Sequence, residues 1–297
     1  MPQPVESGKT GDPVHLDGSR SPSSGLRADL HTHTTHSDGA LSPYELIRRA
    51  HELGLAAVSI TDHDNVGGLD EAIECGKSLG IEVITGLELS VTLGDKDVHL
   101  LAYFIDHKNR DLLDYLMFFR RERLKRAERI VGKLNKINVP LKLESVLEQA
   151  GVGSVGRPHI ANALLDEGLT DTYHEAFERY IGTGGPAYEK KYQLSPVDAF
   201  RLINKAQGLS FLAHPGKYTT ELELSALIKN GLDGIEVVHP AHDEKLQEYY
   251  KGLVNQYFLL ESGGSDFHGG KKNDDHTLGT YTIALQIVET MRSRLFS

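Results

Sequence analysis

The sequence predicts an α/β fold in which a helical segment interrupts a regular alternation of strands and helices. Short apolar runs alternate with amphipathic segments over residues 28–85 and again over residues 209–283, whereas residues 108–205 show no clear strand pattern. Repeated strand-then-helix units place their strands parallel, so we expect parallel strands and a helical insertion. The length of 297 residues fits one large domain with an insertion better than several independent units.

The first part of the chain begins with a strand and a well-marked helix. Ser42 is placed as the N-cap, Pro43 as the first helical residue, and Gly54 ends the segment. The elements expected before residue 108 are strands at 28–31, 56–61 and 81–85, helices at 43–53 and 69–79, and a hairpin of 87–93 with 98–105 around the turn 94–97.

The pattern changes after the hairpin. Residues 109–136 have apolar side chains at helical spacing, together with a basic run at 120–129 for which we expect a solvated helix face. Shorter helices are expected up to residue 205. The alternation then resumes with strands at 209–213, 234–238, 257–261 and 278–283 and helices at 221–229 and 243–254.

These patterns divide the chain into three parts. Residues 1–26 are rich in Gly, Pro and Ser without a hydrophobic period, which predicts a disordered tail. Residues 27–107 and 206–297 are expected to form the α/β domain, and residues 108–205 a helical insertion that lies over it as a cap.

Composition excludes several classes of protein. A net charge of −10 argues against a protein that coats nucleic acid through a broad basic surface. Cys75 is the only cysteine, which excludes an intramolecular disulfide and a multi-cysteine zinc site and suits a reducing compartment. No run approaches the roughly 18 consecutive apolar residues of a membrane helix. We therefore expect a cytoplasmic protein that does not bind a membrane.

Histidines and carboxylates recur at the ends of the expected strands. In His31-Thr32-His33, side chains two residues apart on a strand project to the same face, where both imidazoles can bind one ion. Because the carboxyl ends of strands in α/β folds meet at one edge, we expect the histidines and carboxylates at the other strand ends to converge there with His31 and His33. The candidate metal ligands are His31, His33, Asp38, His63, Glu88, His99, His214, Asp266 and His268.

Such a cluster would be unfavourable in a poorly hydrated cleft unless cations compensate it. Three divalent ions would bring six positive charges against the three carboxylates of this set, leaving a cationic pocket that selects an anion such as phosphate. Nitrogen and oxygen ligands without thiolates suit manganese, iron or zinc, and the sequence does not choose among them.

The ordered motifs resemble those of the PHP family, named for its polymerase and histidinol phosphatase members. They are His31-x-His33, Thr61-Asp62-His63, Glu88, Ala213-His214-Pro215 and Asp266-x-His268, and the resemblance covers about residues 28–285. It implies a distorted seven-stranded (β/α) barrel with two or three divalent ions that hydrolyses phosphoesters. The helical block and Gly156-Arg157-Pro158-His159 are most similar to the branch of nucleoside 3′,5′-bisphosphate phosphatases and 5′-to-3′ exoribonucleases.

The resemblance also implies roles for the candidate ligands. One metal would be held by His31, His33, Glu88 and Asp266, a second by Glu88, His99 and His214, and a third by Asp38, His63 and His268. Asp38 stands where some family members have histidine. Hydrolysis would proceed by a metal-activated hydroxide in which Glu88 and Asp266 act as catalytic ligands.

Other residues are candidates for contacts with substrate. Arg157 is the first, because its planar fork matches phosphate oxygens, and Lys191 and His159 follow. A surface ion pair for Arg157, a solvated Lys191 and a helix-capping His159 are the alternatives. His239 follows an apolar strand and is either a proton donor to the leaving group or part of the pocket wall.

The expected function is hydrolysis of phosphate monoesters of small nucleotides, with short single-stranded oligonucleotides as further substrates. The alternatives are a histidinol-phosphatase-like monoesterase and a catalytically silent metal-binding scaffold. A non-phosphate amidohydrolase ranks last, because such enzymes normally use fewer carboxylate and histidine ligands. The sequence leaves the oligomeric state open.

Overall fold

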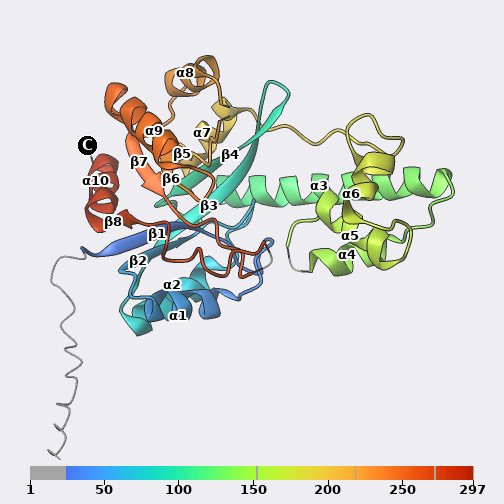
Figure 1. Cartoon of the computed structure of the whole chain (residues 1–297), viewed down its shortest axis with the longest axis horizontal. Helices are drawn as coiled ribbons and strands as arrows, with labels where there is room; N and C mark the ends of the chain where they lie inside the picture. The colour runs from blue at the N-terminus through green and yellow to red at the C-terminus, as the bar shows by residue number, and fades with distance from the viewer. Residues whose placement is uncertain (1–24, 152, 218, 271, 297) are drawn as a thin grey trace, which may run out of the picture.

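The computed structural model describes residues 25–151, 153–217, 219–270 and 272–296, and it contains one nearly closed, barrel-shaped sheet (Figure 1). The expected tail at residues 1–26 falls almost entirely outside this range. The sheet has the strand order β7-β6-β5-β4-β3-β2-β1-β8. Its strands are β1 (Arg27–Thr32), β2 (Ala57–Ile60), β3 (Glu82–Leu93), β4 (Lys96–Tyr103), β5 (Leu209–Leu212), β6 (Gly234–Val238), β7 (Leu260–Gly263) and β8 (Ile283–Ala284).

The helices follow most of the expected positions. They are α1 (Pro43–Glu52), α2 (Leu69–Leu79), α3 (Arg110–Lys136), α4 (Leu143–Ala150), α5 (Arg157–Asp166), α6 (Tyr173–Ala176), α7 (Pro196–Lys205), α8 (Glu221–Lys229), α9 (Glu244–Gln256) and α10 (Leu285–Leu295), with a π-helical turn at Phe177–Ile181. The cap of α1 is as expected: the Ser42 side chain accepts a hydrogen bond from the backbone N–H of Glu45.

The α/β fold class is confirmed, and the sheet differs from the expectation in detail. An eighth strand, β8, pairs antiparallel with β1, where the resemblance implied seven strands. Residues 81–85 and 87–93 were expected as separate strands, but β3 is continuous and pairs antiparallel with β4. The sheet is therefore mixed: β1, β2 and β3 run parallel, as do β5, β6 and β7, and β4 runs antiparallel to both its neighbours.

Alternate residues of the strands face two different hydrophobic clusters. Leu87, Leu89 and Leu100 lie in the cluster that includes buried residues of α1, α2 and α7–α9. Leu101 and Tyr103 face the opposite side, in a cluster shared with α10. Glu88 pairs with Leu101 across the β3–β4 ladder and therefore lies on this second side of the sheet.

A third hydrophobic cluster belongs to the segment between β4 and β5. It joins the C-terminal half of α3 to α4, α5 and α6, which project away from the sheet in Figure 1. Helix α7 packs instead on β3 and β5. The division of the chain into a barrel domain and an insertion at 108–205 stays a prediction.

Within the described residues, no helix combines the length and apolar character needed to cross a membrane.

Candidate metal centre

The end of β1 places two imidazoles in the interior of the barrel. His31 and His33 are fully buried, and the backbone N–H of His33 donates to the carbonyl of Phe267, which joins this strand end to the segment after β7. Gly264 lies so close to β1 that a Cβ there would stand 2.3 Å from the His31 nitrogen. A glycine is therefore required for this approach.

The carboxylate of Glu88 is the centre of the cluster. Its Oε2 lies 3.1 Å from Nδ1 of His63 and 3.3 Å from Nε2 of both His31 and His33. Its Oε1 lies 2.9 Å from Nδ1 of His99 and 3.0 Å from Nε2 of His214. These ligand atoms come from β1, β4 and the loops after β2 and β5, so the barrel brings together groups that are far apart in sequence.

A second carboxylate, Asp266, contacts the same pair of histidines. Its Oδ1 lies 3.1 Å from Nε2 of His33 and 3.3 Å from Nε2 of His31. Its Oδ2 lies 3.5 Å from Nε2 of His239. The backbone N–H of Ala241 donates to Nδ1 of His239, so in neutral His239 Nε2 carries the proton.

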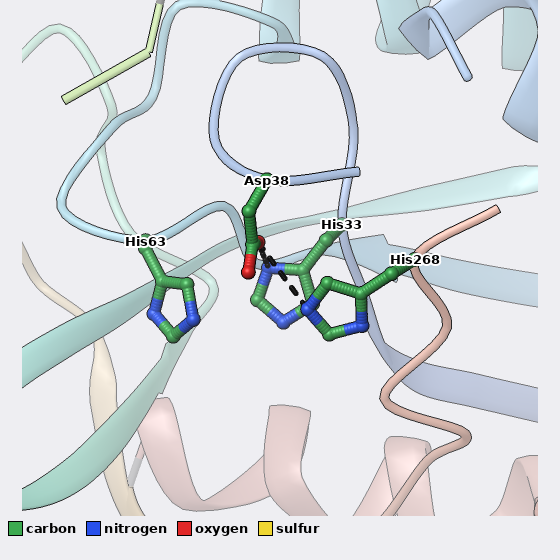
Figure 2. A group of neighbouring side chains, drawn as sticks. All are labelled: His33, Asp38, His63 and His268. Carbon is green, nitrogen blue, oxygen red and sulfur yellow. Dashed lines mark ion pairs between the residues drawn. The ribbon is translucent and has the colours of Figure 1, made fainter. Parts of the chain in front are cut away.

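The third carboxylate, Asp38, lies on the other side of His33. Figure 2 shows it pointing towards the imidazoles of His33 and His268, with His63 to one side. Oδ1 of Asp38 is 3.2 Å from Nε2 of His268 and 3.7 Å from Nδ1 of His33, and the two rings stack with centroids 4.2 Å apart. Lys272 contacts Oδ2 of Asp38 at 3.2 Å.

The structure thus brings all nine candidate ligands into one cluster. Three groups have donor atoms within 4.8 Å of one another and could each hold a metal ion: His33, Asp38, His63 and His268; His31, His33 and Asp266; and His63, Glu88 and His99. Nε2 of His31 and Nε2 of His33 are only 3.1 Å apart and face the same carboxylates. Two ring nitrogens and two carboxylates aimed at one point fit a divalent cation.

Without bound cations, protons on the imidazoles would balance part of the negative charge of the carboxylates. Burial by itself lowers the pKa of His33, but hydrogen bonds to Asp266 and Glu88 and the charge of Glu88 outweigh it and raise the pKa to about 10. Burial, aided by the neighbouring His33 and His99, lowers the pKa of His63 to about 3 against the opposing charge of Glu88. Burial raises the pKa of Glu88, but the surrounding imidazoles hold it well below its usual range.

Glu236 belongs to this centre and was not predicted. It is fully buried on β6, and its Oε1 accepts a hydrogen bond from Nδ1 of His31 at 2.9 Å. Its Oε2 accepts the backbone N–H of His214 at 2.6 Å. The sequence carried a signal, because an acidic residue inside the apolar run of residues 234–238 must have a buried partner.

Asp62 and Asp64, which flank the predicted ligand His63, also position the site. The Asp62 carboxylate accepts hydrogen bonds from the backbone N–H and hydroxyl of Thr34 and from the hydroxyl of Ser37, which fixes the loop after His33. The Asp64 carboxylate accepts a hydrogen bond from Arg123 of α3 at 2.8 Å. Sequence reasoning assigned no role to either aspartate.

A cavity of about 280 Å³ opens beside the candidate metal ligands. All three predicted substrate contacts line it, as do two arginines of α3; these residues are Arg157, Lys191, His159, Arg123 and Arg126. The expectation of a solvated basic face at residues 120–129 is therefore wrong for part of that helix. Arg126 is buried and donates to the carbonyl of Glu189.

The barrel and the cluster of imidazoles and carboxylates define the class of metal-dependent hydrolases. The chain matches the PHP domain over residues 29–263 and belongs to the PHP domain family. It is 33% identical over 246 residues to a 5′-3′ exoribonuclease of Haemophilus influenzae, covering 81% of this chain and 89% of the relative. It is 32% identical over 276 residues to a 3′,5′-nucleoside bisphosphate phosphatase of Chromobacterium violaceum, covering 90% and 97%.

A solved structure from Bifidobacterium adolescentis, assigned as a metal-dependent phosphoesterase, superposes on this chain with a TM-score of 0.77. The two sequences are 32% identical, and the match covers 90% of this chain and 96% of that one. The fold, the family and the clustered ligand types agree: the protein is a metal-dependent phosphoric ester hydrolase.

Proposed function

We propose that this protein removes the 3′-phosphate from nucleoside 3′,5′-bisphosphates and cleaves the first phosphodiester of short 5′-phosphorylated oligonucleotides. The observation that carries the proposal is the juxtaposition of the Glu88 centre with a cavity lined by Arg123, Arg126, Arg157 and Lys191. One phosphate can lie on the metal centre while a second one is held by these cations.

The metal ligands are proposed from the distances between donor atoms. One ion would be held by His31, His33 and Asp266 with Oε2 of Glu88, and another by Glu88, His63 and His99. Divalent ions bound at these positions would lower the pKa of water and polarise phosphoryl oxygens. The family resemblance implied that His63 shares an ion with Asp38 and His268, whereas this proposal assigns it to the ion of Glu88, whose Oε2 lies 3.1 Å from Nδ1 of His63.

His214 and the group around Asp38 complete the set. Nε2 of His214 lies 3.0 Å from Oε1 of Glu88 and 3.4 Å from Nδ1 of His99, so it would share their ion. A further position is offered by Asp38 and His268 with His33. We propose two or three divalent ions of manganese, iron or zinc.

The electrostatics of the cavity favour an anion. Burial, together with the positive charges of Arg157 and Arg123, lowers the pKa of Arg126 to about 10. Among the described residues, no carboxylate forms an ion pair with Arg157, whose guanidinium lies near the rings of Phe177 and Tyr188 at 5.8 and 5.9 Å. A bound phosphate would relieve the repulsion between these cations.

The cationic lining comes from residues 108–205. Arg123 belongs to α3 and Arg157 and His159 to α5, while Lys191 precedes α7 and pairs with Asp97 at 3.1 Å. We therefore propose that this segment is a cap domain that supplies the anchor for the non-scissile phosphate.

His239 is the proposed proton donor. Its Nε2 is buried and has no hydrogen-bond partner among the described residues, and it lies 3.5 Å from Oδ2 of Asp266. Hydrolysis adds water to phosphorus and breaks the P–O3′ bond, and O3′ must then gain a proton. An Nε2–H beside the centre can supply it.

A product analysis tests the proposal. The protein is dialysed against a chelator, reloaded separately with Mn²⁺, Fe²⁺ or Zn²⁺, and assayed on adenosine 3′,5′-bisphosphate, adenosine 5′-monophosphate and histidinol phosphate. We expect one phosphate released per bisphosphate, with adenosine 5′-monophosphate accumulating, and no comparable turnover of the other two. Preference for histidinol phosphate would identify the alternative monoesterase, and no turnover with any metal would identify a silent scaffold.

A further inference from the structure

A second cavity adjoins the first at Asp97 and His99, beside the Glu88 centre. It has a volume of about 270 Å³ and is formed between the β3–β4 hairpin, β5 and α8. His63 lines the first cavity, His214 lines the second, and His99 lines both. Because all three imidazoles contact Glu88, both cavities border the ligands of the same centre.

The second cavity differs from the first in its chemistry. Its wall includes the apolar side chains of Leu93, Val98, Leu212 and Leu227. Its charged side chains are compensated, because Lys96 pairs with Glu223 at 2.8 Å and Asp97 pairs with Lys191 at 3.1 Å. Among the described residues, no arginine lines this cavity, whereas three line the first. It is therefore suited to an uncharged, partly apolar group rather than to a phosphate.

We propose that this cavity binds the nucleoside that follows the scissile phosphate in an oligonucleotide. This inference rests on the proposed function, in which the 5′-terminal nucleotide occupies the first cavity and its 5′-phosphate contacts the arginines. A substrate that continues beyond the scissile phosphate can extend from the Glu88 centre past His99 and His214, which line the second cavity. The cavity there has an apolar wall, and its volume of about 270 Å³ suits one base. This volume lies just below the roughly 300–1,000 Å³ of pockets for drug-sized ligands.

The chemistry of the step is the same for both substrates. Water adds to phosphorus, the P–O3′ bond breaks, and O3′ of the 5′-terminal nucleotide takes a proton. With a bisphosphate the products are a nucleoside 5′-monophosphate and inorganic phosphate. With an oligonucleotide the phosphate stays on O5′ of the following nucleoside, so the second cavity would be occupied only by the longer substrate.

Filling the cavity separates the two activities. Leu93 is half-buried at the end of β3, lines the second cavity and is not one of the proposed metal ligands. Leu93→Trp should lower kcat/KM for the 5′-phosphorylated dinucleotide of adenosine by about tenfold, because the indole would take the space of the base. Turnover of adenosine 3′,5′-bisphosphate should stay within about twofold of the parent protein.

The matched control is Leu222→Trp, because Leu222 lies on α8 with 81% of its surface exposed and does not line the cavity. It should change neither activity. Leu93→Ala serves as a second variant if the larger side chain prevents folding, and it should raise KM for the dinucleotide alone.

Three results would overturn the inference: an equal loss on both substrates, no loss on the dinucleotide, or no cleavage of the dinucleotide by the parent protein while the bisphosphate is hydrolysed. Failure of the parent protein on the bisphosphate itself would instead overturn the proposed function.

Discussion

The carboxylate of Glu236 connects the side chain of His31 to the backbone that carries His214. One oxygen accepts Nδ1–H of His31 at 2.9 Å, and the other accepts the backbone N–H of His214 at 2.6 Å. Because Nδ1 donates to this carboxylate, Nε2 of neutral His31 keeps its lone pair on the side of Glu88 and Asp266. The buried Glu236 on β6 thereby sets the tautomer of His31 and the position of His214.

Glu236→Gln should therefore weaken metal binding by about 10- to 100-fold, the usual cost of losing an outer carboxylate partner. Competition with a chromophoric chelator measures this affinity without relying on turnover. Glu261→Gln is the control, because Glu261 lies on the adjacent strand β7 and pairs near the surface with Lys251. Equal affinities in the two variants would show that Glu236 serves only the packing of the barrel.

His33→Ala and Asp266→Ala should each abolish hydrolysis. Nε2 of His33 and Oδ1 of Asp266 lie 3.1 Å apart, so each substitution removes one side of the same proposed ion site. Each variant should remain folded, since the surrounding strands are held by the hydrophobic clusters. Steady-state rates and circular dichroism melting curves check the two parts of this prediction, and unchanged turnover in either variant would contradict the proposed site.

Arg157→Ala should raise KM for a nucleoside bisphosphate by about tenfold or more with a smaller change in kcat, because charge-assisted hydrogen bonds contribute roughly 1.5–3 kcal/mol. Arg157 lines the first cavity and is not one of the candidate ligands around Glu88. Arg110→Ala is the control, because this side chain is 93% exposed at the start of α3. A fall in kcat at constant KM would show that Arg157 acts in the reaction rather than in binding.

Metal loading should release protons near neutral pH. The pKa of His33 is raised to about 10 in the metal-free centre, so its imidazole is protonated at pH 7 and must lose that proton to bind a metal. Metal affinity should therefore fall as the pH is lowered and rise as the pH approaches 10. Titration calorimetry in buffers of different ionisation enthalpy counts the protons released, and a count of zero at pH 7 would contradict the assignment of His33 as a ligand.

Several elements could be read from local sequence. The N-cap Ser42 and Pro43 marked the start of α1, and the turn at residues 94–97 marked the β3–β4 hairpin. The last strand was expected at residues 278–283, but β8 covers only Ile283–Ala284, and the joining of residues 81–85 and 87–93 into one strand, β3, was not predicted. Pairing with distant strands, rather than local propensity, sets these bounds. Helix α10 was also missed.

Local spacing and the positions of strand ends identified the residue types and the edge of the sheet where the nine candidate ligands lie. They did not identify Glu236, because its role depends on an imidazole and a backbone amide that are distant in sequence. Nor did they predict that Arg123 and Arg126 line the cavity, since this depends on the direction in which α3 extends from the sheet.

The sequence alone determined which groups can bind cations and in what order they follow the strands, because strand periodicity and side-chain chemistry are local properties. Only the tertiary structure decided which atoms share a centre, which buried acid orients them, and that one cavity is cationic and the other mainly apolar. These features arise from closing the sheet, which brings the ends of distant strands within a few ångströms of Glu88.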